Sequence, residues 1–233
     1  CLMEFLRRRL DDEEADRCGR CANCVGATFS TEVDPELVEA ALRSLRSETI
    51  EIVPRRMAPS GMKNELKLKE HNITAGRALT RWGDPGLARQ VELGKYRDHE
   101  FSDDLVDAMV KMVESWAPTP APSWVTSIPS QRHPQLIPDF AAKVAGRLGL
   151  QYVEAVRRAP DSKPQNDMEN SFQQARNVLD GFAVGAVQPG PVLLIDDMVN
   201  SRWTLTVIGS ELSREGSGPV YAVALADAST KAD

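Results

Sequence analysis

Short apolar runs alternate with helical patterns through the second half of the chain, and no other feature constrains its fold as much. Four runs rich in Val, Ile, Leu and Ala predict buried strands, at residues 124–128, 151–156, 192–195 and 220–225. The segments between them predict helices at 138–148, 165–178 and 203–214, and a short extended piece at 181–184. Buried strands that alternate with amphipathic helices form parallel sheets with helices on both faces. We therefore predict an α/β fold in which residues 118–233 form a doubly wound parallel sheet.

A proline-rich segment, APTPAPS at residues 117–123, precedes this pattern. Alternating prolines without large apolar side chains favour an extended, semi-rigid linker, so we predict a domain boundary there. Ahead of it, we expect a small helical module at residues 1–26 and an α+β middle region at residues 27–117. The predicted elements of this half are helices at 1–10, 34–46 and 103–116, and a strand at 49–53. The pattern between 54 and 100 predicts no single fold.

All four cysteines lie within the first 24 positions, at Cys1, Cys18, Cys21 and Cys24. Three of them are separated by two residues each, which lets one tight turn present three thiolates, and Cys1 completes a set of four. Four thiolates suit a structural zinc ion and leave no open coordination position for catalysis. The alternatives are two disulfides or a redox pair. We favour zinc, because a disulfide framework spreads its cysteines over the chain and the sequence shows no signal peptide.

The net charge of -6 argues against a uniformly basic nucleic-acid binder, but basic side chains gather locally between residues 55 and 97. We predict that five of them contact DNA phosphates: Arg55, Arg56, Lys63, Lys67 and Lys69. The alternative is a solvated basic face balanced by the acidic segment 98–114. No apolar run is long enough for a membrane helix, so we expect no membrane partner and a location in the reducing cytoplasm. The three histidines lack ligand spacing and predict no metal site.

The motif VLLIDDMVNSRWT at residues 192–204 carries the clearest chemical signal of the second half. A buried strand that ends in two carboxylates and leads through a polar loop into a helix places acids and backbone N–H groups at the carboxyl edge of a sheet, where open α/β folds bind ligands. Asp196 and Asp197 can accept hydrogen bonds from vicinal sugar hydroxyls or help to hold Mg²⁺. The loop 200–204 can hold a phosphate. The alternative is a helix cap without a ligand.

Residues 122–227 resemble the ComF-like branch of the type I phosphoribosyltransferases. The resemblance rests on this motif, on WVTSIPSQRHP, and on PQNDMENSFQQARNVLDGFAV with its Gln165, Arg176, Asn177, Gly181 and Phe182. It implies a phosphoribosyl or nucleotide ligand and Mg²⁺. The acidic pair would then contact the ribose hydroxyls of phosphoribosyl pyrophosphate, and the loop 130–132 with Arg132 would face its pyrophosphate. The implied 5′-phosphate residues are Asn200, Ser201, Arg202 and Thr204. The family's loop carries a glycine where this chain has Arg202, a departure at the residue that allows a tight turn.

The cysteine spacing and the sequence CGRCANC resemble the zinc-binding subdomain of RecQ-family ATP-dependent DNA helicases, over about 26 residues. The resemblance implies a C-terminal piece of a DNA repair and recombination helicase, with its ATP-binding motor domains upstream of Cys1 in a longer parent chain. It also implies a winged helix that contacts DNA at residues 27–117. This chain lacks a Gly-rich Lys-Ser/Thr phosphate loop, so the piece cannot hydrolyse ATP itself.

Two functions from different classes follow from these patterns. The first is zinc and DNA binding within a RecQ-like helicase whose tail binds a phosphoribosyl or nucleotide ligand. The second is an active ComF-like phosphoribosyltransferase with an accessory N-terminal module. A purely structural tail would bind neither ligand. The pattern identifies no individual catalytic residue.

Overall fold

The computed structural model describes residues 1–26, 32–38, 40–41, 50–71, 73–159 and 170–229, and the chain forms two compact units, Cys1–Arg43 and Ser44–Asp233. The first unit contains α1 (Leu2–Arg9) and α2 (Ala22–Val25). Among its described residues, Ala15 is the only buried apolar side chain, whereas Leu2, Phe5 and Leu6 of α1 are exposed. A unit without an apolar core needs another source of stability.

Part of the helix predicted at 34–46 is present. Residues 35–38 and 40–41 are helical, and Asp34 accepts a hydrogen bond through its Oδ1 from the backbone N–H of Glu36 at 2.9 Å. Residues 42–46 of that prediction lie outside the described residues. The predicted strand at 49–53 is observed as β1 (Ile50–Ile52), in the second unit.

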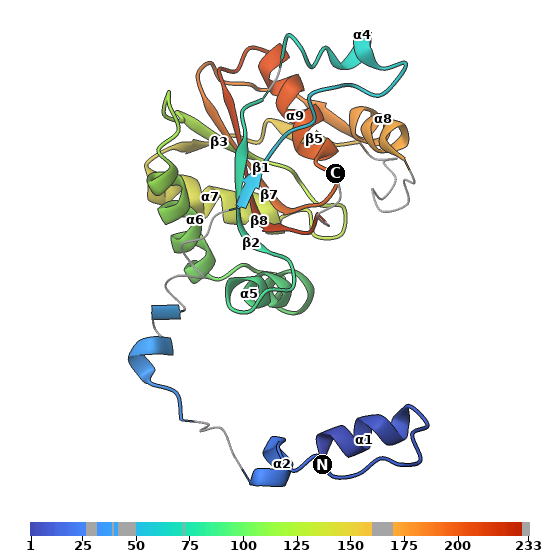
Figure 1. Ribbon diagram of the computed structural model, residues 1–233. Coiled ribbons are helices and arrows are strands. Elements are labelled where there is room, and N and C mark those ends of the chain that lie inside the picture. The colour runs from blue at the N-terminus through green and yellow to red at the C-terminus, as the bar shows by residue number, and fades with distance from the viewer. Residues whose placement is uncertain (27–31, 39, 42–49, 72, 160–169, 230–233) are drawn as a thin grey trace. The chain divides into compact units, whose positions relative to one another are not determined.

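The second unit is built on a six-stranded sheet with the order β1-β2-β8-β7-β3-β4 (Figure 1). The other strands are β2 (Gly76–Arg81), β3 (Trp124–Ser127), β4 (Gln151–Tyr152), β7 (Val192–Val199) and β8 (Val220–Asp227). Every neighbouring pair is parallel except β1 with β2, which is antiparallel. The prediction of a mixed α/β fold with a mostly parallel sheet is confirmed.

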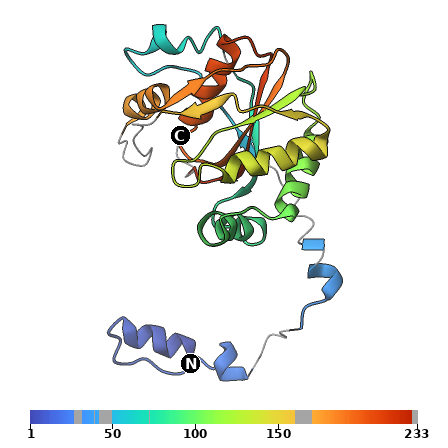
Figure 2. The same ribbon diagram turned by 180° about the vertical axis from the view of Figure 1, so that it is seen from behind.

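Helices cover both faces of this sheet (Figures 1 and 2). Alternate side chains of β7 belong to different layers. Leu193 and Ile195 are in one apolar cluster, and Val192 and Leu194 are in the other. The first layer contains α5 (Leu87–Leu93), α6 (Asp103–Trp116) and α7 (Leu136–Leu148). The second contains α4 (Lys63–Leu66), α8 (Ser171–Gly181) and α9 (Trp203–Arg214). The doubly wound arrangement therefore follows from strands that are apolar on both sides.

Some element boundaries differ from the prediction. β7 and β8 continue to Val199 and Asp227, because these two residues still pair with each other. The predicted strand 151–156 is divided into β4 and β5 (Val156–Arg158), and β5 pairs with β6 (Phe182–Val184) in a separate antiparallel ribbon. Helix α8 begins at Ser171 after an Asn170 cap, and the earlier part of the predicted helix 165–178 lies outside the described residues.

The boundary predicted at 117–123 falls inside the second unit and does not separate two domains. Strand β2, from the middle region, pairs with β8, from the last part of the chain. Helix α6 packs against α7, and the Arg147 guanidinium contacts the Asp107 carboxylate at 2.6 Å. The middle region thus completes the main sheet, which corrects the expectation of a separate winged helix. Prolines predict local extension, but they do not decide whether their flanks share a core.

Residues 54–71, part of the stretch without a predicted fold, cross the outer side of α9 (Figure 1). Met62, Leu66 and Leu68 are buried in the same apolar cluster as α9. The Ser210 hydroxyl of α9 donates to the Leu66 carbonyl at 3.1 Å, and the Arg55 backbone N–H donates to the Thr206 hydroxyl at 3.0 Å. Within the described residues, no helix combines the length and the apolar character that a membrane crossing requires.

Strand β2 approaches β8 so closely at Gly76 that we expect a larger residue there to destabilise the sheet. A Cβ atom at this position would lie 2.1 Å from the Ala222 carbonyl oxygen, so Gly76→Ala should force the two strands apart. We expect the free energy of unfolding to fall by about 2–3 kcal/mol in urea denaturation. Gly146→Ala is the matched control, because a Cβ there meets nothing within 4 Å on helix α7 and should raise stability by about 0.5–1 kcal/mol. Equal effects of the two substitutions would contradict this account of the sheet.

Candidate functional site

A pocket of about 170 Å³ opens at the carboxyl ends of β3 and β7. Within the sheet, β4 lies next to β3 on one edge and β7 lies next to it on the other edge. The chain continues from β3 toward β4, whereas it continues from β7 in the opposite direction, to β8. Neighbouring strands whose connections run in opposite directions leave a crevice between them, which is where open α/β sheets bind ligands. The lining residues are Lys95, Ile128, Pro129, Ser130, Gln131, Ile137, Arg158, Asn177, Phe182, Asp196, Asp197 and Thr204.

The acidic pair lies within β7 and not after it, because β7 extends past the predicted end. Asp196 and Asp197 are 7% and 6% exposed, and the Asp197 backbone N–H donates to Asp196 Oδ1 at 2.8 Å. Burial, followed by the neighbouring Asp197 charge, raises the pKa of Asp196 to about 8. Asp196 can therefore hold a proton near neutral pH and donate a hydrogen bond as well as accept one.

A lysine from the middle region reaches this pair. Lys95 lies in the π-helical turn η1 (Gly94–Asp98), and its Nζ is 2.8 Å from Asp197 Oδ2. The two side chains are only 17% and 9% exposed. The sequence patterns did not identify Lys95, because it precedes the acidic motif by about a hundred residues and only the fold brings the two together.

The loop between β7 and α9 has a glycine-like turn, although Arg202 stands at the position where the resembled family has glycine. Arg202, the N-cap of α9, has φ 67° and ψ -6°, which is the left-handed conformation that glycine adopts most easily. The Arg55 side chain supports this loop through a hydrogen bond from its Nε to the Ser201 carbonyl at 3.1 Å. The N-terminus of a 12-residue helix thus lies beside the pocket, with Thr204 in the lining. Helix N-termini of this kind favour phosphate groups.

The predicted ligand residues divide into two groups. Asp196, Asp197 and Thr204 line the pocket, whereas Arg132, Asn200, Ser201 and Arg202 are not among the lining side chains. The loop after β3 contributes Ser130 and Gln131 instead of Arg132. Asn177 and Phe182, which belong to the motif quoted above, also face the pocket. Arg158, like Lys95, had no local sequence signal, and burial lowers its pKa.

The five predicted DNA-contacting residues lie along the segment that crosses α9. Arg56, Lys63, Lys67 and Lys69 are exposed. Arg55 is half-buried and hydrogen-bonded to the Ser201 carbonyl, and its guanidinium lies 5.9 Å from the Trp203 ring centroid. Arg55 therefore supports the loop before α9, and the four exposed side chains are the ones that remain available for phosphate contacts.

Two histidines are neighbours and not isolated side chains. His99 and His133 stack with ring centroids 4.4 Å apart and an angle of 24° between the rings. His133 belongs to the loop after β3, and His99 follows η1. Among the described residues, the four cysteines form the only group of at least three His, Cys, Asp or Glu ligand atoms close enough to hold a metal ion. His99 and His133 therefore contact each other through their rings, which the spacing of the histidines in the sequence did not indicate.

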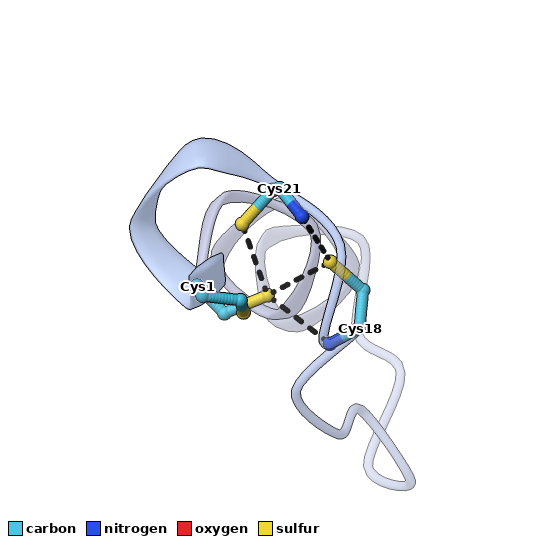
Figure 3. A group of neighbouring side chains, drawn as sticks. Cys1, Cys18 and Cys21 are labelled. Carbon is cyan, nitrogen blue, oxygen red and sulfur yellow. Dashed lines mark hydrogen bonds between the residues drawn. The ribbon is translucent and has the colours of Figure 1, made fainter. Parts of the chain in front are cut away.

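In the first unit, the four cysteine sulfur atoms lie within 4.8 Å of one another, and all four are free thiols. Figure 3 shows the sulfur atoms of Cys1, Cys18 and Cys21 directed toward one another. Cys1 Sγ is 3.5 Å from Cys18 Sγ and 3.8 Å from Cys21 Sγ. A tetrahedron with Zn–S bonds of about 2.3 Å has edges of about 3.8 Å, so these distances fit one zinc ion.

Backbone donors surround the sulfur atoms as they do in structural metal sites. The backbone N–H groups of Glu4 and Cys18 donate to Cys1 Sγ at 3.4 and 3.3 Å, and that of Cys21 donates to Cys18 Sγ at 3.4 Å. Hydrogen bonding from the Leu2 backbone is the largest influence that lowers the pKa of Cys21 to about 6. A thiolate is the form that binds zinc, so these donors favour the liganding state.

No protein-family model matches the chain, and no curated protein matches it. Among solved structures, the chain is similar to adenine phosphoribosyltransferase from Leishmania tarentolae, with 14% identity and a TM-score of 0.35 over 54% of this chain and 69% of that one. A second adenine phosphoribosyltransferase structure has 13% identity and a TM-score of 0.36 over 55% and 81%. The structure from Leishmania donovani has 14% identity and a TM-score of 0.35 over 79% and 78%.

The cysteine site predicts that zinc holds the first unit together. Purified protein should contain about one zinc ion per chain, and Cys21→Ser should lose most of it, because three thiolates leave the tetrahedron incomplete. Chelation should also abolish the far-ultraviolet circular dichroism contributed by α1, because this unit has almost no buried apolar surface. Glu13→Gln, an exposed change in the same unit, should keep its zinc. Full zinc content in Cys21→Ser, measured by mass spectrometry of the metal, would contradict the site.

Proposed function

We propose that the second unit, which has a phosphoribosyltransferase-like fold, binds a phosphorylated ribose of the phosphoribosyl pyrophosphate type. The observation that carries this proposal is the convergence at one pocket of the acidic pair, the N-terminus of α9 and two basic side chains, Lys95 and Arg158. Each of these features suits a different part of such a ligand. Their position at the carboxyl edge between β3 and β7 is the expected ligand position for this sheet topology.

The chemistry of the pocket divides naturally among the parts of the ligand. Carboxyl groups suit vicinal hydroxyls, which donate hydrogen bonds, and Asp196 and Asp197 are the lining residues of this type. The 5′-phosphate suits the N-terminus of α9, where backbone N–H groups lack helical partners. The pyrophosphate suits the loop after β3 together with Arg158, because hydroxyl, amide and guanidinium groups all donate to anionic oxygens.

Transfer of the ribosyl group would also use these residues. The bond between C1′ and the pyrophosphate oxygen breaks, and its electron pair leaves with the pyrophosphate. The acceptor forms a new bond to C1′ and releases its proton to water. Positioned donors lower the barrier by stabilising the charge that develops on the leaving oxygens. Ligand binding is the function that the pocket supports best, and turnover is the additional activity that an acceptor screen tests.

Titration with phosphoribosyl pyrophosphate by calorimetry tests this function. We expect the wild-type protein to bind, and the combined Asp196→Asn and Asp197→Asn variant to bind at least about tenfold more weakly, because each substitution replaces a carboxyl oxygen that can accept from a ribose hydroxyl by an NH₂ group that can only donate. The matched control combines Asp103→Asn with Asp104→Asn, an exposed pair in the first turn of α6. The function is excluded if wild-type protein shows no binding both with and without Mg²⁺.

We propose as a second function that the chain contacts DNA, in the manner of a piece of a RecQ-like helicase. Two observations support it: the four-cysteine site fits zinc, and Arg56, Lys63, Lys67 and Lys69 are exposed within one short segment. Basic side chains on a surface segment contact phosphates without choosing a sequence.

Fluorescence anisotropy with single-stranded and forked DNA tests the second function. A lysine that contacts a DNA phosphate displaces counterions, and each lost contact lowers the number of counterions that binding releases. The combined Lys63→Ala, Lys67→Ala and Lys69→Ala variant should therefore bind more weakly and depend less on salt concentration. A control with three exposed basic residues removed elsewhere (Arg89→Ala, Lys111→Ala and Arg157→Ala) should keep most of the affinity. Equal loss in the two variants would show that net charge, and not this segment, determines DNA binding.

A further inference from the structure

The Lys95–Asp197 ion pair lies in the wall of the ligand pocket and not in the apolar core. Both residues line the pocket, and their charged atoms are 2.8 Å apart. Two charges at low exposure are costly to desolvate, and apolar residues of similar size are often at least as stable there. An ion pair placed at a cavity, where a ligand can contact it, is therefore better explained by what it binds than by what it stabilises.

The turn that carries Lys95 is held firmly in place. A Cβ at the preceding Gly94 would lie 2.8 Å from both the Glu100 carbonyl oxygen and Phe101 Cδ1, so the backbone packs tightly at this point. Phe101 in turn packs edge-to-face on Phe140 of α7, with ring centroids 5.4 Å apart. π-Helical turns such as η1 are frequent at functional sites. Lys95 thus enters the pocket from a rigid support.

The oxygen donors in the pocket do not suit Mg²⁺. This ion requires nearly octahedral coordination by oxygen and is usually held by one or two carboxylates together with phosphate oxygens. Here the Lys95 ammonium already occupies Oδ2 of Asp197, and Asp196 Oδ1 accepts the Asp197 backbone N–H. Each carboxyl group thus has one oxygen already engaged, and the Lys95 charge next to Asp197 repels a second cation. The residues present therefore fit a fixed ammonium better than a divalent cation.

We propose that Lys95 takes the place of the divalent cation in this pocket, so that a phosphoribosyl pyrophosphate-type ligand binds without Mg²⁺. An ammonium has three donor hydrogens. One contacts Asp197, and the others remain for the anionic oxygens of the ligand. Together with Arg158, Lys95 offsets the negative charge that a metal ion would otherwise neutralise. This inference rests on the proposed function and adds a residue and a metal requirement to it.

Calorimetric titration of the whole chain with phosphoribosyl pyrophosphate, with and without millimolar MgCl₂, tests the inference. Divalent cations are removed from the buffers with a chelating resin and not with a soluble chelator, so that a metal ion held by the four cysteines is not extracted. We expect dissociation constants that agree within about threefold under the two conditions. Binding only in the presence of Mg²⁺ would overturn the role of Lys95 and leave the proposed function intact. Absence of binding in both conditions would overturn the function itself.

Substitution of Lys95 adds a second, independent readout. Lys95→Met should bind at least about tenfold more weakly without Mg²⁺ and recover most of this loss when Mg²⁺ is added, because Asp197 then becomes free to contact the ion. Lys95→Arg should keep the metal-independent behaviour, since it keeps the charge. Lys111→Met, an exposed change on α6, is the charge-matched control. Unchanged, metal-independent binding by Lys95→Met would refute the inference. The comparison of wild-type protein with and without Mg²⁺ decides the question even if Lys95→Met fails to fold.

Discussion

The parallel pairing of β7 with β8 is the interaction on which the rest of the second unit depends. It runs from Val192 opposite Val220 to Val199 opposite Asp227, and strands on both sides extend it into the six-stranded sheet. Because both faces of β7 are apolar, helices must cover both, and the carboxyl edge becomes the place where polar groups can gather. The length of this pairing also determines where the acidic pair lies. The ladder continues past Asp196 and Asp197, so both carboxyl groups are buried in the wall of a pocket and not exposed in a loop.

Burial then controls the electrostatics of the pocket. A carboxyl group removed from water disfavours its charged form, which raises the pKa of Asp196, while Asp197 keeps a cationic partner in Lys95. The partner comes from a segment that packs through Phe101 and Phe140 into the layer of α5, α6 and α7. One consequence is that the middle region contributes Lys95 to the wall of the pocket. The proline-rich segment 117–123 connects two halves of one unit, and removal of residues before it would remove both β2 and Lys95.

The two units are stabilised by different physical means. The second unit has two extensive apolar clusters, one on each face of its sheet, whereas the described part of the first unit buries a single apolar side chain, Ala15. Four thiols within 4.8 Å of one another supply the missing stability only when they share a metal ion. Removal of a metal ion from the four thiols should therefore affect the first unit and leave the sheet folded. The metal content of the cysteine cluster and the ligand affinity of the pocket can then be measured separately on the same protein.

Local patterns in the sequence predicted most strands and helices, the cysteine cluster and the acidic motif, because apolar periodicity and ligand spacing act over a few residues. They did not predict β2, which lies in the stretch without an assigned fold. The family resemblance named Ser130, Asn177 and Phe182, which line the pocket. Only the tertiary structure decided the position of Lys95 and Arg158, the pairing of β2 with β8, and the left-handed turn at Arg202. These features depend on which distant segments share a core. Contacts of that kind follow from packing and burial over the whole sheet, and no short stretch of sequence encodes them.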